Sequence, residues 1–223
     1  MEQAVICIFA KPPEAGKVKT RLVPELGEQR AAELAEAFLQ DTVAMVRECP
    51  WARCAIAATE HFERDYFLPD EVWLQGEGDL GMRLERIFRR GLRRFGMVFA
   101  VGADSPGLRP SYLARAREEL AKADAVLGGA RDGGFYLLGM KKCPEGILDR
   151  IQWSHSQTYT ETITRLHRKG WTTAAIDTWF DIDTPEDLHQ VLPKMESDLS
   201  SAPITLALLR KWYPQGPLRK TTL

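Results

Sequence analysis

The sequence lacks an excess of charge of either sign. Its 30 Lys and Arg residues balance 31 Asp and Glu residues, which leaves a formal net charge of -1. A chain this close to neutrality creates no overall field that would attract nucleic acid or an anionic membrane. We therefore expect no nucleic-acid partner, and any site for an anion must be built locally.

The chain also lacks paired cysteines and long apolar runs. Its four cysteines occur singly, without a CxxC pair, which favours a reducing compartment. The opening run AVICIFA is too short for the core of a signal peptide, and no run approaches the roughly eighteen apolar residues of a membrane-spanning helix. These absences predict a cytoplasmic protein with no membrane span.

The composition and rhythm of the chain are those of a globular α/β protein. It has 223 residues, of which 44% are hydrophobic and 27% charged, a length that suits one domain or two small ones. Short β-branched runs alternate with segments of helical period, which predicts a mostly parallel central sheet in a three-layer α/β/α fold. The predicted strands cover 5–9, 54–58, 72–74 and 97–101, and the predicted helices cover 28–47, 80–95 and 111–122. The strands over 5–9 and 97–101 are apolar on both faces, which places them at the centre.

The pattern changes after Asp124. The runs AVLGG and FYLLGM, joined through an Asp-Gly turn, predict an antiparallel hairpin. A helix over 160–169, a strand over 172–176 and a helix with Thr184 as its N-cap should follow. The segment over 204–213 is compatible with a docked helix or a partner-binding one. We predict a main domain over 1–199 and a C-terminal tail over 200–223.

Four cations lie in the loop KPPEAGKVKTRL over 11–22, which follows the first predicted strand. Ligands bind at the carboxyl ends of strands in open α/β sheets. Gly16 would let the backbone approach a phosphate whose charge Lys17, Lys19 and Arg21 neutralise. The loop is not a P-loop, because the first Gly and the final Ser or Thr of that motif are missing. A solvated basic loop is the alternative.

Asp104 directly follows the strand over 97–101, so its carboxylate should lie at the end of the sheet. Mg²⁺ is typically held by one or two carboxylates together with substrate phosphates. Asp181 and Asp183 lie on the same side of an extended segment and supply a candidate second ligand. The alternatives are that Asp104 caps the next turn and that Asp183 only assists a helix N-terminus.

The run GEGDLG over 76–81 matches the dinucleotide-binding pattern GxGxxG between a predicted strand and a helix. Asp104 lies at a suitable distance beyond it for a ribose-binding acid. Against this interpretation, Glu77 and Asp79 place two negative charges in the loop that must approach a pyrophosphate. A dinucleotide-binding protein is therefore a minority alternative.

Two further residues are candidates for contacts with a substrate. Asp132, in the turn RDGG over 131–134, is a candidate acceptor or general base for a substrate hydroxyl, or simply part of a hairpin turn. His155 is a candidate substrate contact, although a lone His is more often structural. The other three histidines lack metal-ligand spacing.

Taken in order, these motifs resemble the nucleotide-diphospho-sugar transferase superfamily with the GT-A fold, and in particular a bacterial branch of small glycosyltransferases. FAKPPEAGKVKTRL resembles the nucleotide-binding first loop and VGADSPGL the acidic metal-binding motif. DGGFYLLG resembles the acceptor-side hairpin and FDIDTPEDL the closing segment. The resemblance covers about residues 4–192.

The resemblance implies a Rossmann-like GT-A sheet and a metal-dependent transferase. Asp104 would bind Mg²⁺ or Mn²⁺, and Asp183 would complete that site. Asp104, Asp132 and Lys19 would act in catalysis. The residues implied in nucleotide binding are Ala10, Lys11, Gly16, Lys17, Lys19, Arg21, Asp79, Gly102 and Asp104.

The motif after the strand over 97–101 bears on the reaction. Glycosyltransferases of this superfamily usually carry Asp-x-Asp, whereas this chain has Asp104-Ser105-Pro106, which is closer to the single Asp of nucleotidyltransferases. We favour glycosyl transfer from a nucleotide sugar to a small-molecule acceptor. The alternatives are nucleotidyl transfer from a nucleoside triphosphate to a phosphorylated small molecule, with pyrophosphate release, and non-catalytic nucleotide binding. An oligomer is compatible with the sequence.

Overall fold

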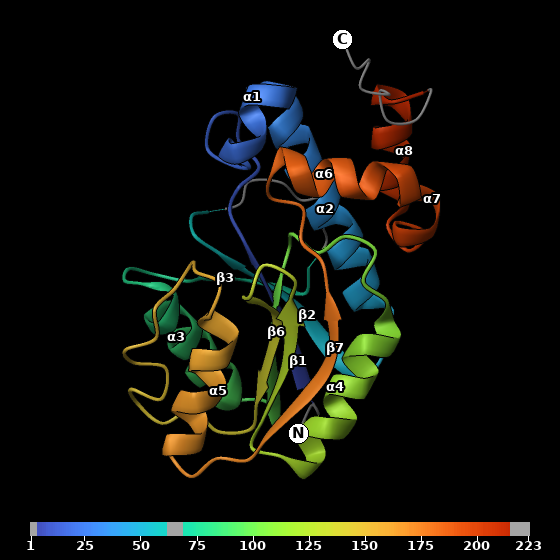
Figure 1. Ribbon diagram of the computed structural model, residues 1–223. Helices are drawn as coiled ribbons and strands as arrows, with labels where there is room; N and C mark the ends of the chain where they lie inside the picture. Colours follow the sequence, from blue (N-terminus) through green and yellow to red (C-terminus); the bar gives the residue numbers. More distant parts are fainter. Residues whose placement is uncertain (1–3, 62–68, 215–223) are drawn as a thin grey trace.

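A seven-stranded sheet runs through the computed structural model, which describes residues 4–61 and 69–214 (Figure 1). The strands are β1 (Ala4–Ala10), β2 (Ala52–Ala58), β3 (Glu71–Leu74), β4 (Met97–Gly102), β5 (Ala125–Ala130), β6 (Phe135–Met140) and β7 (Thr173–Trp179). Their order in the sheet is β3-β2-β1-β4-β6-β5-β7. Only β6 runs antiparallel to its neighbours. The predicted α/β sheet, mostly parallel with an antiparallel excursion, is therefore confirmed.

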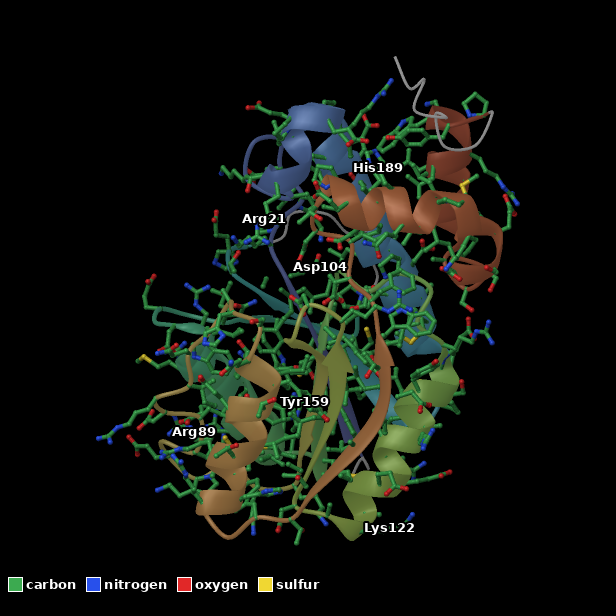
Figure 2. All side chains as sticks on the ribbon, viewed as in Figure 1. Arg21, Arg89, Asp104, Lys122, Tyr159 and His189 are labelled. Carbon is green, nitrogen blue, oxygen red and sulfur yellow. The ribbon has the colours of Figure 1, made fainter. Side chains whose placement is uncertain are left out.

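Helices cover both faces of this sheet. They are α1 (Val23–Leu26), α2 (Glu28–Arg47), α3 (Leu80–Leu92), α4 (Pro110–Lys122), α5 (Thr158–Arg168), α6 (Pro185–Val191), α7 (Met195–Asp198) and α8 (Pro203–Trp212), with the 3₁₀ helices η1 (Thr20–Leu22) and η3 (Leu192–Lys194). α2 and α4 pack on one face, and α3 and α5 on the other. In Figure 2, Arg89 of α3 and Lys122 of α4 lie on opposite sides of the sheet. None of the helices in the described ranges is long and apolar enough to cross a membrane.

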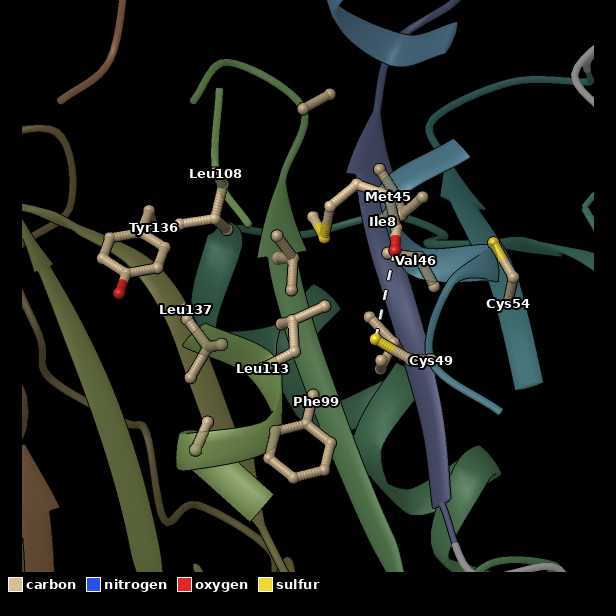
Figure 3. Packing of buried hydrophobic residues seen from close by; sticks show 14 of the residues in the cluster. Ile8, Met45, Val46, Cys49, Cys54, Phe99, Leu108, Leu113, Tyr136 and Leu137 are labelled. Atoms are coloured by element: carbon tan, nitrogen blue, oxygen red, sulfur yellow. Dashed lines mark hydrogen bonds between the residues drawn. The ribbon is translucent and has the colours of Figure 1, made fainter. Parts of the chain in front are cut away.

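β1 and β4 form the centre of the sheet, as their two-faced apolar pattern predicts. Ile8 of β1 faces the layer of α2 and α4, whereas Cys7 faces the layer of α3 and α5. Figure 3 shows the first of these layers, where Ile8 shares a cluster with Val46 of α2 and Phe99 of β4. Burial raises the pKa of the Cys7 thiol far above its usual range, and all four cysteines are free. Cys7 is therefore a packing residue.

A third hydrophobic cluster lies beyond the carboxyl ends of the strands, among α1, α2, α6 and α8 (Figure 1). Asp41 of α2 holds α8 in place, because its carboxylate accepts hydrogen bonds from the backbone N–H groups of Ile204 at 3.0 Å and Thr205 at 2.8 Å. Ile182, in the segment after β7, is completely buried in this cluster. The third cluster thereby fixes the backbone on either side of Ile182.

Most boundaries lie within two residues of the predictions, and the larger differences are at the ends of β7 and α3. β7 continues to Trp179, because the end of the strand still pairs with Ala130 although Asp177 and Thr178 break the apolar pattern. α3 ends at Leu92 rather than Phe95, since the chain turns there. The hairpin of β5 and β6 and the N-cap at Thr184 are confirmed.

Candidate functional site

Six of the seven strands end at one edge of the sheet, and a cavity of about 710 Å³ lies there. We call it the main cavity. The loop over 11–22 after β1 forms part of its wall, and single residues that follow other strands also line it. These residues are Thr59 after β2, Gln75 after β3, Asp104 after β4, Asp132 after β5 and Asp183 after β7. Figure 2 shows Asp104 at this edge, with Arg21 nearby. Strand topology therefore brings together residues that are far apart in the sequence.

Lys19 lies between the two aspartates that the sequence predicts as metal ligands. Its Nζ is 2.6 Å from Asp183 Oδ1 and 2.9 Å from Asp104 Oδ1. It also donates a hydrogen bond to the carbonyl of Ile182 at 2.8 Å. Burial by itself would lower the pKa of this ammonium, but the two carboxylates outweigh it and the pKa is raised. Asp104 and Asp183 thus share one site, with Lys19 as their common partner.

The segments that carry Asp104 and Asp183 are tied directly to each other. The N–H of Ile182 donates to the carbonyl of Asp104 at 3.1 Å, and the ring N–H of Trp179 donates to the carbonyl of Pro106 at 3.1 Å. Asp183 is not the cap of α6, since Thr184 occupies that position. The carboxylate of Asp183 pairs with Lys19 instead.

Asp181 takes a different partner from Asp183. Its carboxylate accepts a hydrogen bond from the hydroxyl of Ser105. Burial raises the pKa of Asp181 to about 7, and although the Ser105 hydrogen bond opposes this shift, the nearby carboxylates of Asp104, Asp183 and Asp132 add to it. The site therefore contains a carboxyl group that tends to keep its proton.

The cations of the first loop differ in whether they already have a partner within the protein. Lys17 is largely exposed and pairs with Glu14 at 2.6 Å, which raises its pKa. Lys11 and Arg21 line the main cavity and form no ion pair within the described part of the chain. Lys19, by contrast, is occupied by protein oxygens. Its predicted contact with phosphate stays a prediction.

The main cavity contains most of the predicted nucleotide-binding residues. Those that line it are Ala10, Lys11, Lys17, Lys19, Arg21 and Asp104. Gly16, Gly102 and Asp79 are not part of its lining. Gly16 adopts a left-handed φ of 76° that suits a glycine. Asp79 caps α3, accepting the N–H of Met82 at 2.9 Å.

The GxGxxG loop is hydrogen-bonded to the helix that follows it, α3. Arg86 of α3 donates to the carbonyls of Gln75 and Glu77, so two carbonyls of the loop already have partners. The loop also follows β3, which is an edge strand rather than the first strand of the sheet. Its glycines therefore serve a tight strand-to-helix turn.

Arg83 is a site residue that our sequence reasoning missed. It lies in the first turn of α3 and lines the main cavity. With Lys11 and Lys17 it also lines a neighbouring cavity of about 270 Å³, here called the cationic cavity, whose lining includes Glu14 and Glu60 as well. Its Nε is buried without a hydrogen-bond partner among the described residues. A cation in the first turn opposes the helix dipole, and this unfavourable placement is the signal that would have pointed to it.

Asp132 and His155 also line the main cavity. His155 Nδ1 accepts the N–H of Gln157 at 3.0 Å, which places the ring proton on Nε2, next to the side-chain oxygen of Gln152 at 3.0 Å. Both ring nitrogens are thus engaged, so His155 orders its own loop. Asp132 accepts only the N–H of Gly134, at 2.8 Å, among the described groups.

A side cavity of about 290 Å³ adjoins the main one and shares Arg21, Asp132 and Asp183 with it. Arg131, Phe180 and Lys194 are among its other lining residues. The site therefore has two lobes that meet at Arg21, Asp132 and Asp183.

The donor set at this cluster suits a hard divalent cation that brings other ligands with it. Within the described ranges, no group of three or more His, Cys, Asp or Glu residues forms a metal site. Mg²⁺ needs only one or two carboxylates when phosphate oxygens and water supply the rest. Asp104 and Asp183 meet that smaller requirement through their exposed oxygens.

Comparison with known proteins identifies the family. A family model described as an uncharacterized protein conserved in bacteria (DUF2064) matches residues 42–155. The chain belongs to this family. No curated protein matches the sequence.

Solved structures share the fold over most of the chain. A proposed nucleotide-diphospho-sugar transferase from Desulfovibrio desulfuricans G20 is 27% identical, with a TM-score of 0.82 over 95% of this chain and 99% of the other. A CMP:2-keto-3-deoxy-manno-octonic acid synthetase complexed with CTP is 13% identical, with a TM-score of 0.55 over 88% and 100%. The 2-C-methyl-D-erythritol 4-phosphate cytidylyltransferase of Thermus thermophilus is 16% identical, with a TM-score of 0.51 over 90% and 99%. The predicted resemblance to nucleotide-diphospho-sugar transferases is confirmed.

The raised pKa of Asp181 predicts a pH-dependent effect of the Asp181→Asn substitution. Because the folded pKa of about 7 lies above the ordinary 3.8, folding favours the protonated form, and stability is lost as pH rises from about 4 through 7. Asn is neutral at every pH, so in metal-free buffer it should stabilise the protein at pH 8 by at least about 1 kcal/mol more than at pH 4. Urea denaturation at both pH values measures this difference, with the surface substitution Glu118→Gln as the control. The same effect at the two pH values would contradict the assignment.

Proposed function

We propose that this protein is a metal-dependent glycosyltransferase that uses a nucleoside diphosphate sugar and a small-molecule acceptor. The observation that carries the proposal is the meeting of Asp104 and Asp183 in a cavity whose other wall is a cationic loop. Carboxylates hold a hard metal ion, and cations bind the phosphates that this metal bridges. A leaving nucleoside diphosphate is the group that such a site stabilises.

The residues of the site have separate tasks in this proposal. Asp104 and Asp183 would hold Mg²⁺ or Mn²⁺, which when bound supplies charge neutralisation at the departing diphosphate. Lys17 and Arg21 bind phosphate oxygens. The acceptor enters the side cavity, and Asp132 accepts the proton of its hydroxyl as the oxygen attacks the anomeric carbon and the bond to the diphosphate breaks.

The comparisons support this choice over others. The solved structure that matches at 27% identity is a proposed nucleotide-diphospho-sugar transferase, and the match covers nearly the whole of both chains. The presence of two adjoining lobes also suits a reaction with two substrates, one in each lobe.

Nucleotidyl transfer is the second candidate. It is favoured by the single aspartate at position 104. The cationic cavity, where three cations outnumber Glu14 and Glu60, leaves a net positive charge for a further phosphate group. The cytidylyltransferase among the matching structures supports it as well. In this reaction a phosphate oxygen of the acceptor attacks the α-phosphorus of a nucleoside triphosphate, and pyrophosphate leaves.

Product analysis separates the two reactions. The protein would be incubated with Mn²⁺ and either UDP- and GDP-sugars or CTP and GTP, together with candidate acceptors. Release of a nucleoside diphosphate from a nucleotide sugar supports glycosyl transfer, whereas pyrophosphate release from a triphosphate supports nucleotidyl transfer. Tight NADH binding without metal dependence would exclude both.

Asp104→Asn should remove metal-dependent nucleotide binding. The substitution takes away one of two carboxylate ligands, yet the exposed side chain contributes little packing, so the melting temperature should stay within about 5 °C of the wild type. Calorimetric titration with UDP or CTP, with and without Mn²⁺, measures the effect. Asp177→Asn, which removes an exposed carboxylate of β7 paired with Arg115, is the matched control. Nucleotide binding that still depends on Mn²⁺ in Asp104→Asn would refute the role of Asp104.

Arg83→Met should weaken nucleotide binding by about tenfold, because it removes from the cavity wall a guanidinium whose Nε has no partner among the described residues, while keeping an apolar stem. The same calorimetric titration reports the change. Arg93→Met, at the opposite end of α3, removes an equal charge from an exposed position and should leave the affinity unchanged. Equal affinities in the two variants would place Arg83 outside the nucleotide site.

A further inference from the structure

The ammonium of Lys19 is surrounded by protein oxygens. An ammonium has three N–H donors, and three acceptors lie within 2.9 Å of Nζ: Asp183 Oδ1, Asp104 Oδ1 and the Ile182 carbonyl. The side chain is only 5% exposed and passes over the ring of Phe38, with Nζ 5.3 Å from its centre. Lys19 therefore differs from the other cations of its loop, none of which pairs with Asp104 or Asp183 within the described ranges.

The backbone holds Lys19 in this position. Its φ of 46° and ψ of 40° lie in the left-handed region, which is uncommon for a residue with a side chain. The N–H of Leu22 donates to the Lys19 carbonyl at 2.8 Å, and Leu22 itself is completely buried. A conformation of this kind persists only where the surrounding structure imposes it. The ammonium is thus built into the cluster.

Lys19 uses only one oxygen of each carboxylate. The side chains of Asp104 and Asp183 remain 51% and 41% exposed, and no described group bonds to their Oδ2 atoms. A metal ion at this cluster would bind these oxygens, because Lys19 occupies the Oδ1 atoms. The two carboxylates alone would carry a charge of -2, but with the Lys19 ammonium the cluster carries -1. A divalent cation bound there would also lie a few ångströms from the positive charge of Lys19, which repels it.

We propose that Lys19 is a built-in cation that suppresses binding of a free divalent metal ion to Asp104 and Asp183. The metal is retained only together with the phosphates of a nucleotide, whose negative charge offsets that of Lys19. The ligand of the site is therefore a metal–nucleotide complex and not the bare ion. The first half of this inference, that Lys19 suppresses binding of the free metal ion, rests on the geometry alone. The second half, that the metal is retained together with a nucleotide, rests on the proposed function.

Titration with Mn²⁺ in the absence of nucleotide tests the first half. Free Mn²⁺, measured by its electron paramagnetic resonance signal, would be compared for the wild type, Lys19→Gln and Lys19→Met. Removing a unit charge this close to the metal should tighten Mn²⁺ binding by about tenfold or more in both neutral variants. Lys11→Met removes a charge from the same loop without touching either carboxylate, so its Mn²⁺ affinity should match the wild type.

Two neutral variants are used because they differ in hydrogen bonding. The Gln side chain can still donate N–H groups to the carboxylates, whereas the Met side chain has no donor. Thermal melting identifies the folded variants. If every folded neutral variant binds Mn²⁺ no more tightly than the wild type, the proposal is overturned, whatever nucleotide the protein binds.

Titration of the wild type alone tests the second half and remains available if neither variant folds. Adding UDP or CTP at saturation should tighten Mn²⁺ binding at least about tenfold, and Mn²⁺ should tighten nucleotide binding by the same factor, since coupling is reciprocal. Equal Mn²⁺ affinities with and without bound nucleotide would overturn the inference. A protein that binds no nucleotide under any condition, and yet binds Mn²⁺ more tightly in Lys19→Gln, would refute the proposed function and support the role of Lys19.

Discussion

The site depends on one electrostatic arrangement, an ammonium held between two carboxylates from opposite halves of the chain. Asp104 and Asp183 lie close enough to share Lys19, and without a cation between them their charges would repel at the end of the sheet. The rest of the fold secures this geometry. β4 presents Asp104 from the centre of the sheet, the third cluster fixes Ile182 beside Asp183, and the left-handed backbone at Lys19 directs its side chain inward.

The two lobes of the site follow from the same arrangement. The cationic loop and Arg83 line the main cavity, and Arg131 and Lys194 line the side cavity, with Arg21 shared by both. A transferase must bring a donor and an acceptor to one reacting centre, and proximity of this kind accounts for much of the rate of such reactions. A metal ion at Asp104 and Asp183 would stand at the junction of the lobes, where a diphosphate leaving group and an acceptor hydroxyl would meet.

Local sequence patterns predicted the seven strands and the longer helices, but not the short helices α1 and α7. The apolar runs of β1 and β4 predicted the centre of the sheet, and the position of Asp104 after a buried strand predicted its place at the edge. They were not sufficient for the interactions that join distant segments. The contacts of Lys19 with Ile182 and Asp183 span 163 and 164 residues, so the charge pattern of the loop suggested a phosphate ligand where the fold places an ion pair. Arg83 was missed because its burial and lack of a partner are tertiary properties.

The central claim, that Asp104 and Asp183 hold a metal ion against a nucleotide, is tested most directly by anomalous diffraction from crystals grown with Mn²⁺ and a bound nucleotide. The account predicts an anomalous peak within coordination distance of both carboxylates and of a phosphate oxygen. A nucleotide seated in the main cavity with no metal at Asp104 or Asp183, or with its metal elsewhere, would contradict it.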